Sequence, residues 1–391
     1  GKALAEWYLF LIEEIQKAGK EIVLFAHDIL INDEHVMKTI QKHNAVVYYW
    51  EYSIKKKYPK IDKLKEQGLT VVGGPAVFDW SRHYPYSDYA EQNTINMAKD
   101  GMKRGLIGLV TTKWGDFFNE NFRNNIFYGL AVNGQAAWTP EKSVPSQIQD
   151  AFLWLFFGCK ESKIMSCMDT LNKQNEPLPR WPNGMMNRFW YDPFVRKVKS
   201  KEYDMAERFI REAKRIFEEI EGVRREEVVR VNDQNLDYII FAARMARHYG
   251  VKLLISEGTY TGNDDLILRA QRLVGFEGRD QGKDPELEGY KWLKEDVEDM
   301  LPAYRELWLR LAVKEGLEHP TQRFKWLAWH YEKAIGQLKQ GDKPHSHQLK
   351  SHWIWRNGIR WSAEWGNGEF YYFKKSRSEE HTSELQSPLC I

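Results

Sequence analysis

The sequence has few cysteines, little net charge and no long apolar run. Its 3 cysteines, Cys159, Cys167 and Cys390, form no even, spaced set, which excludes a disulfide scaffold. The formal net charge of +2 gives no reason to expect nucleic acid as a partner. The richest apolar run, residues 151–157, is far shorter than the ~20 residues that cross a bilayer, so we expect no membrane segment.

Aromatic residues, in contrast, are abundant: they make up 14% of the chain, which contains 16 Trp. An indole ring packs a hydrophobic core in its more frequent role, but it also stacks on the apolar face of a sugar ring. Hydrophobic residues make up 42% of the 391 positions, which is enough for packed cores. At ~100–200 residues per domain, the length predicts two or three domains.

The first part of the chain alternates short apolar runs with segments of helical spacing. The runs at 22–25, 45–50, 69–72 and 106–111 are rich in β-branched or aromatic residues, as buried strands are. Glycines such as Gly68 stand at the helix-to-strand turns, a pattern typical of parallel βα units. An open doubly wound sheet and a closed barrel both fit this order. No Gly-rich phosphate loop follows any run, and this favours the barrel.

Pro140 and Pro145 mark a boundary beyond which the pattern is almost entirely helical. We therefore predict an α/β fold in which half of a (β/α)8 TIM barrel occupies residues 1–140. A mainly α-helical domain follows over 141–340, and a Trp-rich segment of strands or irregular structure over 341–376. Residues 377–391 begin with RSEEHTSELQS, which resembles the translation of a sequencing adapter, so we expect them to lie outside the fold.

The ends of the four apolar runs each place an acidic residue close to aromatic residues. Carboxylates accept hydrogen bonds from sugar hydroxyls, and indole rings pack against the sugar face. Active sites of barrel enzymes lie at the carboxyl ends of the strands, so the four ends together predict a carbohydrate site. The four segments are Phe25-Ala26-His27-Asp28, Tyr49-Trp50-Glu51-Tyr52, Phe78-Asp79-Trp80 and Lys113-Trp114-Gly115-Asp116.

Residues 105–116 resemble the last barrel strand of glycoside hydrolase family 20, the β-N-acetylhexosaminidases. Residues 74–80, from Gly-Pro to Trp, resemble the family's seventh strand, and residues 46–52 and 22–30 resemble the sixth and fifth. The resemblance implies that the chain holds strands five to eight of the barrel. It implies substrate-binding roles for Asp28, Trp50, Asp79, Trp80, Trp114 and Asp116.

The resemblance also implies an activity: exo-acting, retaining hydrolysis that releases terminal N-acetylglucosamine or N-acetylgalactosamine, with neither metal nor cofactor. In this family an Asp-Glu pair after the fourth strand supplies the general acid and orients the substrate acetamide. We expect that pair upstream of Gly1 and therefore expect the chain as given to be inactive. Asp33 and Glu34 are adjacent acids, but they stand at a predicted helix start, where capping explains them. The sequence Ala26-His27-Asp28 departs from the family's Trp-Gly-Asp.

Two other functions fit the same residues. The changed fifth-strand end suits a sugar-binding protein without catalytic activity. Arg82 and His83 lie in the loop after the third run. The sequence is equally compatible with a loop that shapes the mouth of a site and with a loop exposed to solvent. A different barrel glycosidase, with two carboxylates as acid and nucleophile, is the remaining alternative. Its candidate carboxylates are Asp28, Glu51, Asp79 and Asp116.

Overall fold

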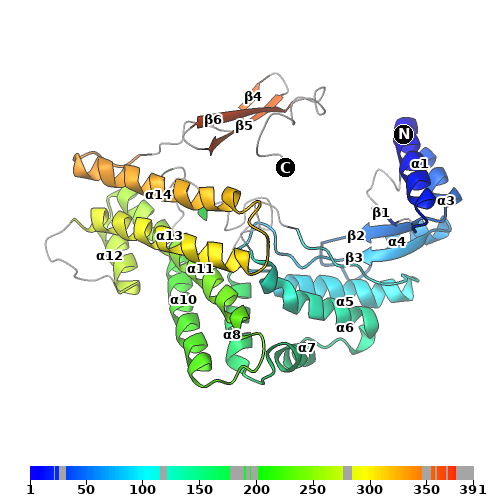
Figure 1. Ribbon diagram of the computed structural model, residues 1–391, viewed down its shortest axis with the longest axis horizontal. Helices are drawn as coiled ribbons and strands as arrows, with labels where there is room; N and C mark the ends of the chain where they lie inside the picture. Colours follow the sequence, from blue (N-terminus) through cyan, green and yellow to red (C-terminus); the bar gives the residue numbers. More distant parts are fainter. Residues whose placement is uncertain are drawn as a thin grey trace. The chain divides into compact units, whose positions relative to one another are not determined.

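The protein is described by a computed structural model (Figure 1), in which two compact units are defined. Unit 1 comprises Gly1–Glu176 and Ile220–Leu236, and unit 2 comprises Pro177–Glu219 and Asp237–Ile391. The domain limits expected from the sequence stay predictions. The described residues are 1–21, 23–25, 32–114, 121–176, 189–190, 194, 201–275, 284–345, 354–356, 359–366 and 369–375.

Unit 1 begins with a small parallel sheet and the helices that pack on it. Strands β1 (Val23–Phe25), β2 (Val46–Trp50) and β3 (Thr70–Gly74) lie in the order β1-β2-β3, with Trp50 paired to Gly74. Val47, Tyr49 and Val71 are buried in one apolar cluster with residues of the helices, so the sheet and helices share a core. These helices are α1 (Lys2–Lys17), α3 (Glu34–Lys42), α4 (Lys60–Glu66) and α5 (Ser87–Lys103).

The fourth apolar run forms no strand. Segment 106–112 lies beside β3 through hydrogen bonds such as Ile107 N to Val71 O at 3.0 Å, but it makes only isolated bridges, at Leu109 and Thr112. Ile107 and Val110 are 63% and 51% exposed. A parallel strand covered by helices buries both faces, so these exposures do not fit a barrel wall.

The rest of unit 1 is helical. The helix α7 (Pro145–Phe152) continues directly into the π-helical turn η3 (Leu153–Phe157), which ends at Gly158 with φ +66°. Cys159 and Cys167 are buried free thiols. The other elements are η1 (Arg123–Ile126), α6 (Phe127–Trp138), η2 (Pro140–Lys142), α8 (Ser162–Lys173), the end of α10 (Lys201–Arg225) and η4 (Asp233–Asn235).

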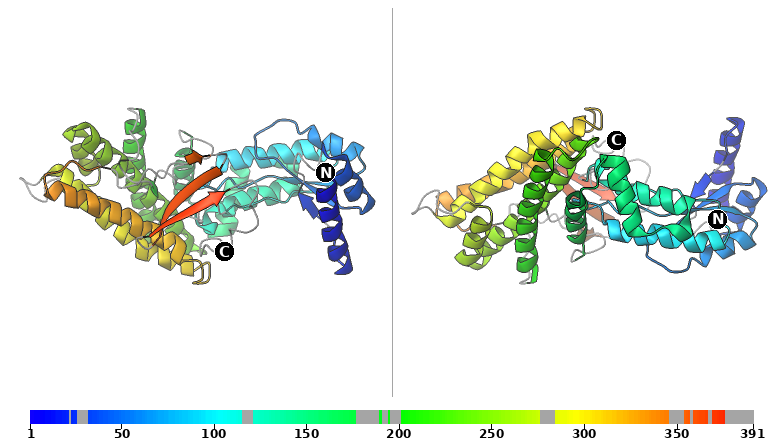
Figure 2. Two further views of the ribbon diagram at one scale, coloured as in Figure 1. Left: turned by 90° about the horizontal axis from the view of Figure 1, so that it is seen from above. Right: turned by 90° about the horizontal axis from the view of Figure 1, so that it is seen from below.

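Unit 2 is a bundle of long helices followed by a three-stranded antiparallel sheet. α13 (Pro285–Leu309) and α14 (Glu318–Lys339) run side by side (Figures 1 and 2). The sheet has the order β4-β5-β6 and falls within the Trp-rich segment. The remaining elements are the first part of α10, α11 (Leu236–Thr261), α12 (Asp264–Leu273), β4 (Ile354–Arg356), β5 (Ile359–Gly366) and β6 (Glu369–Lys375).

The predicted fold class is therefore wrong. The described chain is mainly helical, and it is not the second half of a (β/α)8 barrel. Its parallel strands contain only three, five and five residues, and most buried apolar side chains belong to helices. The alternation of short apolar runs with helices does not distinguish a closed barrel from a small open sheet, and the structure has the small sheet. No helix within the described residues is long and apolar enough to cross a membrane.

Candidate functional site

The backbone framework of the site is built at the carboxyl ends of β2 and β3. Thr112 N donates to Pro75 O and Val77 N donates to Thr112 O, both at 3.0 Å, so the two chain segments are fixed side by side. Tyr48 reaches across to donate from its hydroxyl to Val110 O at 3.1 Å. A Cβ on Gly74 would lie 2.4 Å from Tyr48 Cζ, so only glycine leaves room for this ring.

Five aromatic residues gather on this framework, and we call them the aromatic cluster. Ring centroids of Trp50 and Tyr52 are 5.1 Å apart, those of Tyr52 and Trp80 5.5 Å, and those of Phe78 and Trp80 4.4 Å. Trp114 joins through a hydrogen bond from its Nε1 to the Tyr52 hydroxyl at 2.7 Å. These centroid spacings are typical of interacting aromatic pairs, so the rings hold one another in place.

Trp114 is the most exposed member of the cluster, at 41%. Its indole Nε1 lies 2.7 Å from the Tyr52 hydroxyl and 3.1 Å from Thr112 Oγ1, and its backbone N donates to Asp79 Oδ1 at 3.2 Å. The ring is thus anchored by its polar edge. An exposed, pre-positioned indole is suited to stacking on a ligand ring.

Asp79 accepts from the backbone N of Trp114 and is only 2% exposed. Its Oδ2 lies 3.5 Å from Lys113 Nζ. Burial raises the pKa of Asp79 to about 6, although the Lys113 charge and the Trp114 N–H both act to lower it. The carboxyl group therefore holds the backbone of the Trp114 segment, and its burial keeps it from a ligand.

The turn that carries Asp79 and Trp80 has unusual backbone angles. Phe78 and Ser81 adopt φ of +56° and +57°. A bulky residue such as Phe is rarely found in this left-handed region, and residues held there cluster at functional sites. The surrounding contacts must supply the free energy that keeps the turn in this shape.

Those contacts come from residues just after α8. Arg82 and His83 are each 1% exposed. Arg82 Nη1 donates to Asn175 Oδ1 at 2.9 Å, and His83 Nε2 lies 2.9 Å from Gln174 Oε1. Burial lowers the pKa of His83 to about 4, although the Gln174 bond opposes this shift. From the sequence, Arg82 and His83 fitted either the mouth of a site or a solvated loop. In the structure both side chains are buried, so neither residue lies in a solvated loop.

The sequence-predicted residues Trp50, Asp79, Trp80 and Trp114 do come together. Trp80, however, is only 9% exposed and packs in a buried cluster with Phe78, so it supports the site from within. Asp28 and Asp116 lie outside the described residues.

Sequence reasoning missed the roles of Tyr52, Thr112 and Lys113. The period-2 spacing of Tyr48, Trp50 and Tyr52 was the available signal for Tyr52, because alternate strand residues share a face. Lys113 was visible only as a neighbour of Trp114. Its approach to Asp79 depends on how the segments pack, which spacing in the sequence does not encode.

The other acidic candidates have structural partners. Asp33 caps α3, accepting at Oδ1 from His35 N at 3.0 Å and Val36 N at 3.2 Å, as the sequence predicted. Glu51 forms an ion pair with Lys55. In the described part of the chain, no three His, Cys, Asp or Glu side chains gather as ligands of a metal ion.

Comparisons with known proteins show only a distant structural similarity. No protein-family model and no curated protein matches the sequence. Among solved structures, the chain is similar to a GH138 enzyme targeting pectin rhamnogalacturonan II, a glycoside hydrolase, with a TM-score of 0.41 and 12% identity. The match covers 83% of this chain and 46% of that enzyme, so the chain spans less than half of its length.

Proposed function

We propose that unit 1 binds carbohydrate on the aromatic cluster and that it forms the sugar-holding part of a glycoside hydrolase of the β-N-acetylhexosaminidase type. The observation that carries this proposal is the exposed Trp114 indole, fixed by hydrogen bonds at its Nε1 and backbone N. A terminal N-acetylhexosamine ring stacks on the indole face. The acetamide of that sugar adds a polar group that the neighbouring hydroxyls can bind.

The polar groups around the indole suit a sugar. Tyr52 OH and Thr112 Oγ1 lie 3.0 Å apart at the indole edge, where Thr112 donates to Pro75 O and Tyr52 donates to Thr112, which leaves the Tyr52 oxygen able to accept from a sugar hydroxyl. Lys113, with 24% of its side chain exposed, adds a donor on the same segment. Such a combination of one apolar face and a few oriented polar groups is typical of small-molecule sites.

The described residues hold a sugar but do not form a bond-cleaving pair. Asp79 is buried and accepts from the Trp114 backbone, and Glu51 forms an ion pair with Lys55. The sequence's Asp-Glu pair, Asp33 and Glu34, serves the start of α3, where Glu34 pairs with Lys38 at 2.5 Å. We therefore assign binding, not hydrolysis, to the chain as given.

Calorimetric titration of the full chain tests the binding proposal. N,N′-diacetylchitobiose should bind more tightly than cellobiose, because cellobiose lacks the acetamide. Trp114→Ala should weaken chitobiose binding about tenfold, or about 1.4 kcal/mol, by removing the stacking face. The matched control is Trp138→Ala, which removes an indole that is 88% exposed on α6. Equal affinities of these two variants would contradict the proposal.

A chromogenic N-acetyl-β-glucosaminide separates binding from catalysis. We expect no turnover by the chain above the uncatalysed rate. Turnover that disappears in Asp79→Asn would show instead that this buried carboxyl group takes part in the chemistry, as in the two-carboxylate alternative. Turnover unchanged in that variant would point to contamination by another hydrolase.

A further inference from the structure

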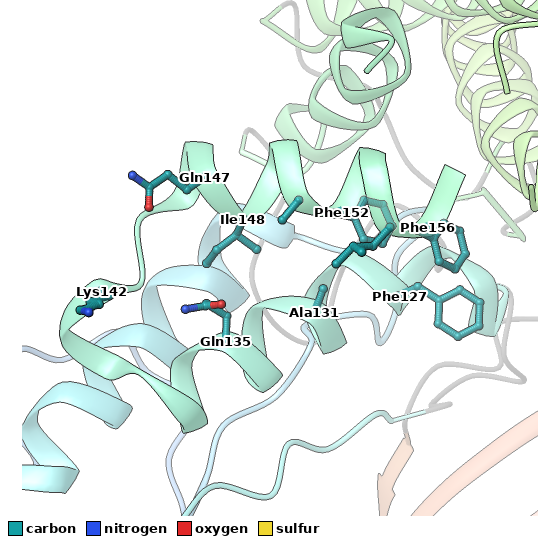
Figure 3. A pocket seen from close by; sticks show the side chains of 10 residues that line it. Phe127, Ala131, Gln135, Lys142, Gln147, Ile148, Phe152 and Phe156 are labelled. Carbon is teal, nitrogen blue, oxygen red and sulfur yellow. The ribbon is translucent and has the colours of Figure 1, made fainter. Parts of the chain in front are cut away.

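A second candidate site lies in unit 1, in a groove of about 420 Å³ between α6 and the continuous helix α7–η3 (Figure 3). This volume falls within the range of about 300–1,000 Å³ that small-molecule pockets occupy. None of the aromatic cluster lines it. The groove is therefore separate from the proposed carbohydrate site.

One end of the groove is aromatic. Phe127 and Phe156 have ring centroids 5.2 Å apart, and Phe152 stacks on Phe156 at 4.9 Å with only 11° between the ring planes. Leu155 also lines the groove and is 76% exposed. Flat, near-parallel rings at a partly open surface favour insertion of another flat ring, because offset stacking adds to apolar burial.

The other end is polar and positively charged. Lys142 and Gln147 lie at the end away from Phe127 and Phe156 (Figure 3). Lys142 is the cation among the lining residues, and no lining residue is acidic. The adjacent Glu141 pairs with Lys103 at 3.5 Å, and within the described residues Lys142 forms no ion pair. The charge at this end complements an anion.

The wall between the two ends is held in a fixed shape. It includes the π-helical turn η3, a conformation that is rare and frequent at functional sites. Asn232 Nδ2 donates to Phe156 O at 2.7 Å and Arg230 N donates to Phe157 O at 3.0 Å, so residues of the same unit brace the turn from outside the groove. A braced wall means that the groove exists before the ligand arrives.

We propose that this groove binds an aromatic carboxylate, with the ring against Phe127, Phe152 and Phe156 and the carboxylate directed to Lys142. At ~30 Å³ per non-hydrogen atom, the volume that a water molecule occupies in the liquid, a ligand of about thirteen such atoms fits. A naphthoate has this size and the required separation of a flat apolar body from one negative group. The inference is independent of the carbohydrate site.

Titration of the full chain with 2-naphthoate, followed by calorimetry, tests the proposal. Lys142→Met should weaken binding about three- to fivefold, since it removes one partly exposed charge pair. The matched control Lys20→Met changes an exposed lysine that lies outside the groove and should bind as the parent does. Equal affinities of the two methionine variants would overturn the assignment of the carboxylate to Lys142.

Three further measurements complete the test. Ala131→Trp should abolish binding by filling the groove, and its circular dichroism and melting temperature show whether it folds. Naphthalene-2-methanol, a neutral ligand of the same shape, should bind more weakly than 2-naphthoate. Octanoate, with no ring, should also bind more weakly. Absence of naphthoate binding, or tighter binding of either comparison ligand, would overturn the proposal.

Discussion

Asp79 in unit 1 and Asp296 in unit 2 are both buried carboxyl groups beside a cation, and the two groups differ in what surrounds them. Asp79 in unit 1 is 2% exposed, with the Trp114 N–H and one lysine 3.5 Å away. Asp296 in unit 2 is 6% exposed and meets His248 Nδ1 at 2.9 Å and Arg247 Nη2 at 2.5 Å. Both are buried, but only Asp296 has close partners on both of its oxygens.

This difference sets the pKa of the two groups in opposite directions. Burial raises the pKa of Asp79 to about 6, because Lys113 offsets it only in part. Burial would also raise the pKa of Asp296, but the His248 bond and the Arg247 and Arg244 charges outweigh it and lower that pKa. The well-partnered acid stabilises a network within unit 2, whereas the sparsely partnered one holds the backbone of the exposed Trp114.

The largest effect should come from the well-partnered acid. Asp296→Ala leaves His248 and Arg247 without their carboxylate and should lower the free energy of unfolding by about 3–5 kcal/mol, as loss of one partner of a buried pair does. Urea unfolding followed by circular dichroism measures this. The control Asp299→Ala changes an exposed acid on the same helix and should leave stability nearly unchanged. A loss below ~1 kcal/mol for Asp296→Ala would remove the distinction between the two acids.

The next effect is on the pH dependence of unit 1. The pKa of Asp79 is raised from 3.8 to about 6, so between these values the folded state binds more protons and stability falls as pH rises. The pKa of His83 is lowered from 6.5 to about 4, so between these values the unfolded state binds more protons and stability rises with pH. The two contributions oppose each other in the window from pH 4 to 6.

Single variants should reveal the two slopes. Relative to the parent, Asp79→Asn should gain stability as pH rises from 4 to 6, by up to about 3 kcal/mol at 1.36 kcal/mol per pKa unit. His83→Gln, which keeps an amide near Gln174, should lose stability relative to the parent over the same window. Urea midpoints at half-unit pH steps measure both. Parallel pH profiles for the parent and both variants would show that neither group titrates in this window.

Much of the local structure followed from the sequence. The apolar runs at 22–25 and 45–50 contain β1 and β2, and the run at 69–72 overlaps the first part of β3, which continues to Gly74. The signals were local: β-branched runs for strands, and helical spacing ended by glycine for helices. The barrel was wrong because it required long-range packing, and covering layers of helices cannot be read from a run of four to six residues.

For the site, the sequence predicted which residues come together but not how exposed each one is. Trp50, Asp79 and Trp80 come together because the parallel strands β2 and β3 end at one edge of the sheet, and Trp114 joins them from the segment that runs beside β3 without forming a strand. Which of them face solvent was not predictable: Trp80 is 9% exposed and Trp114 41%, although both stand within two residues of an acid. The difference depends on the left-handed turn at Phe78 and on partners almost a hundred residues away, such as Asn175.

The smallest effect compares two tyrosine hydroxyls, one in each unit. Tyr331 is fully buried and its hydroxyl lies 2.9 Å from His248 Nε2, so Tyr331→Phe leaves a buried ring nitrogen without that partner and should cost about 1–3 kcal/mol. Tyr52 is only half-buried, and water can replace its hydroxyl at Trp114 Nε1, so Tyr52→Phe should cost less than ~1 kcal/mol.

The two phenylalanine variants should separate further in ligand binding. Tyr52→Phe frees the indole edge of Trp114 and removes a hydroxyl from the aromatic cluster, so its affinity for N,N′-diacetylchitobiose should fall severalfold while its urea midpoint stays near that of the parent. Tyr331→Phe should show the reverse, a lower midpoint with unchanged affinity. If Tyr52→Phe lost stability and kept its affinity, Tyr52 would belong to the core alone, and the polar edge of the indole would have no part in holding the sugar.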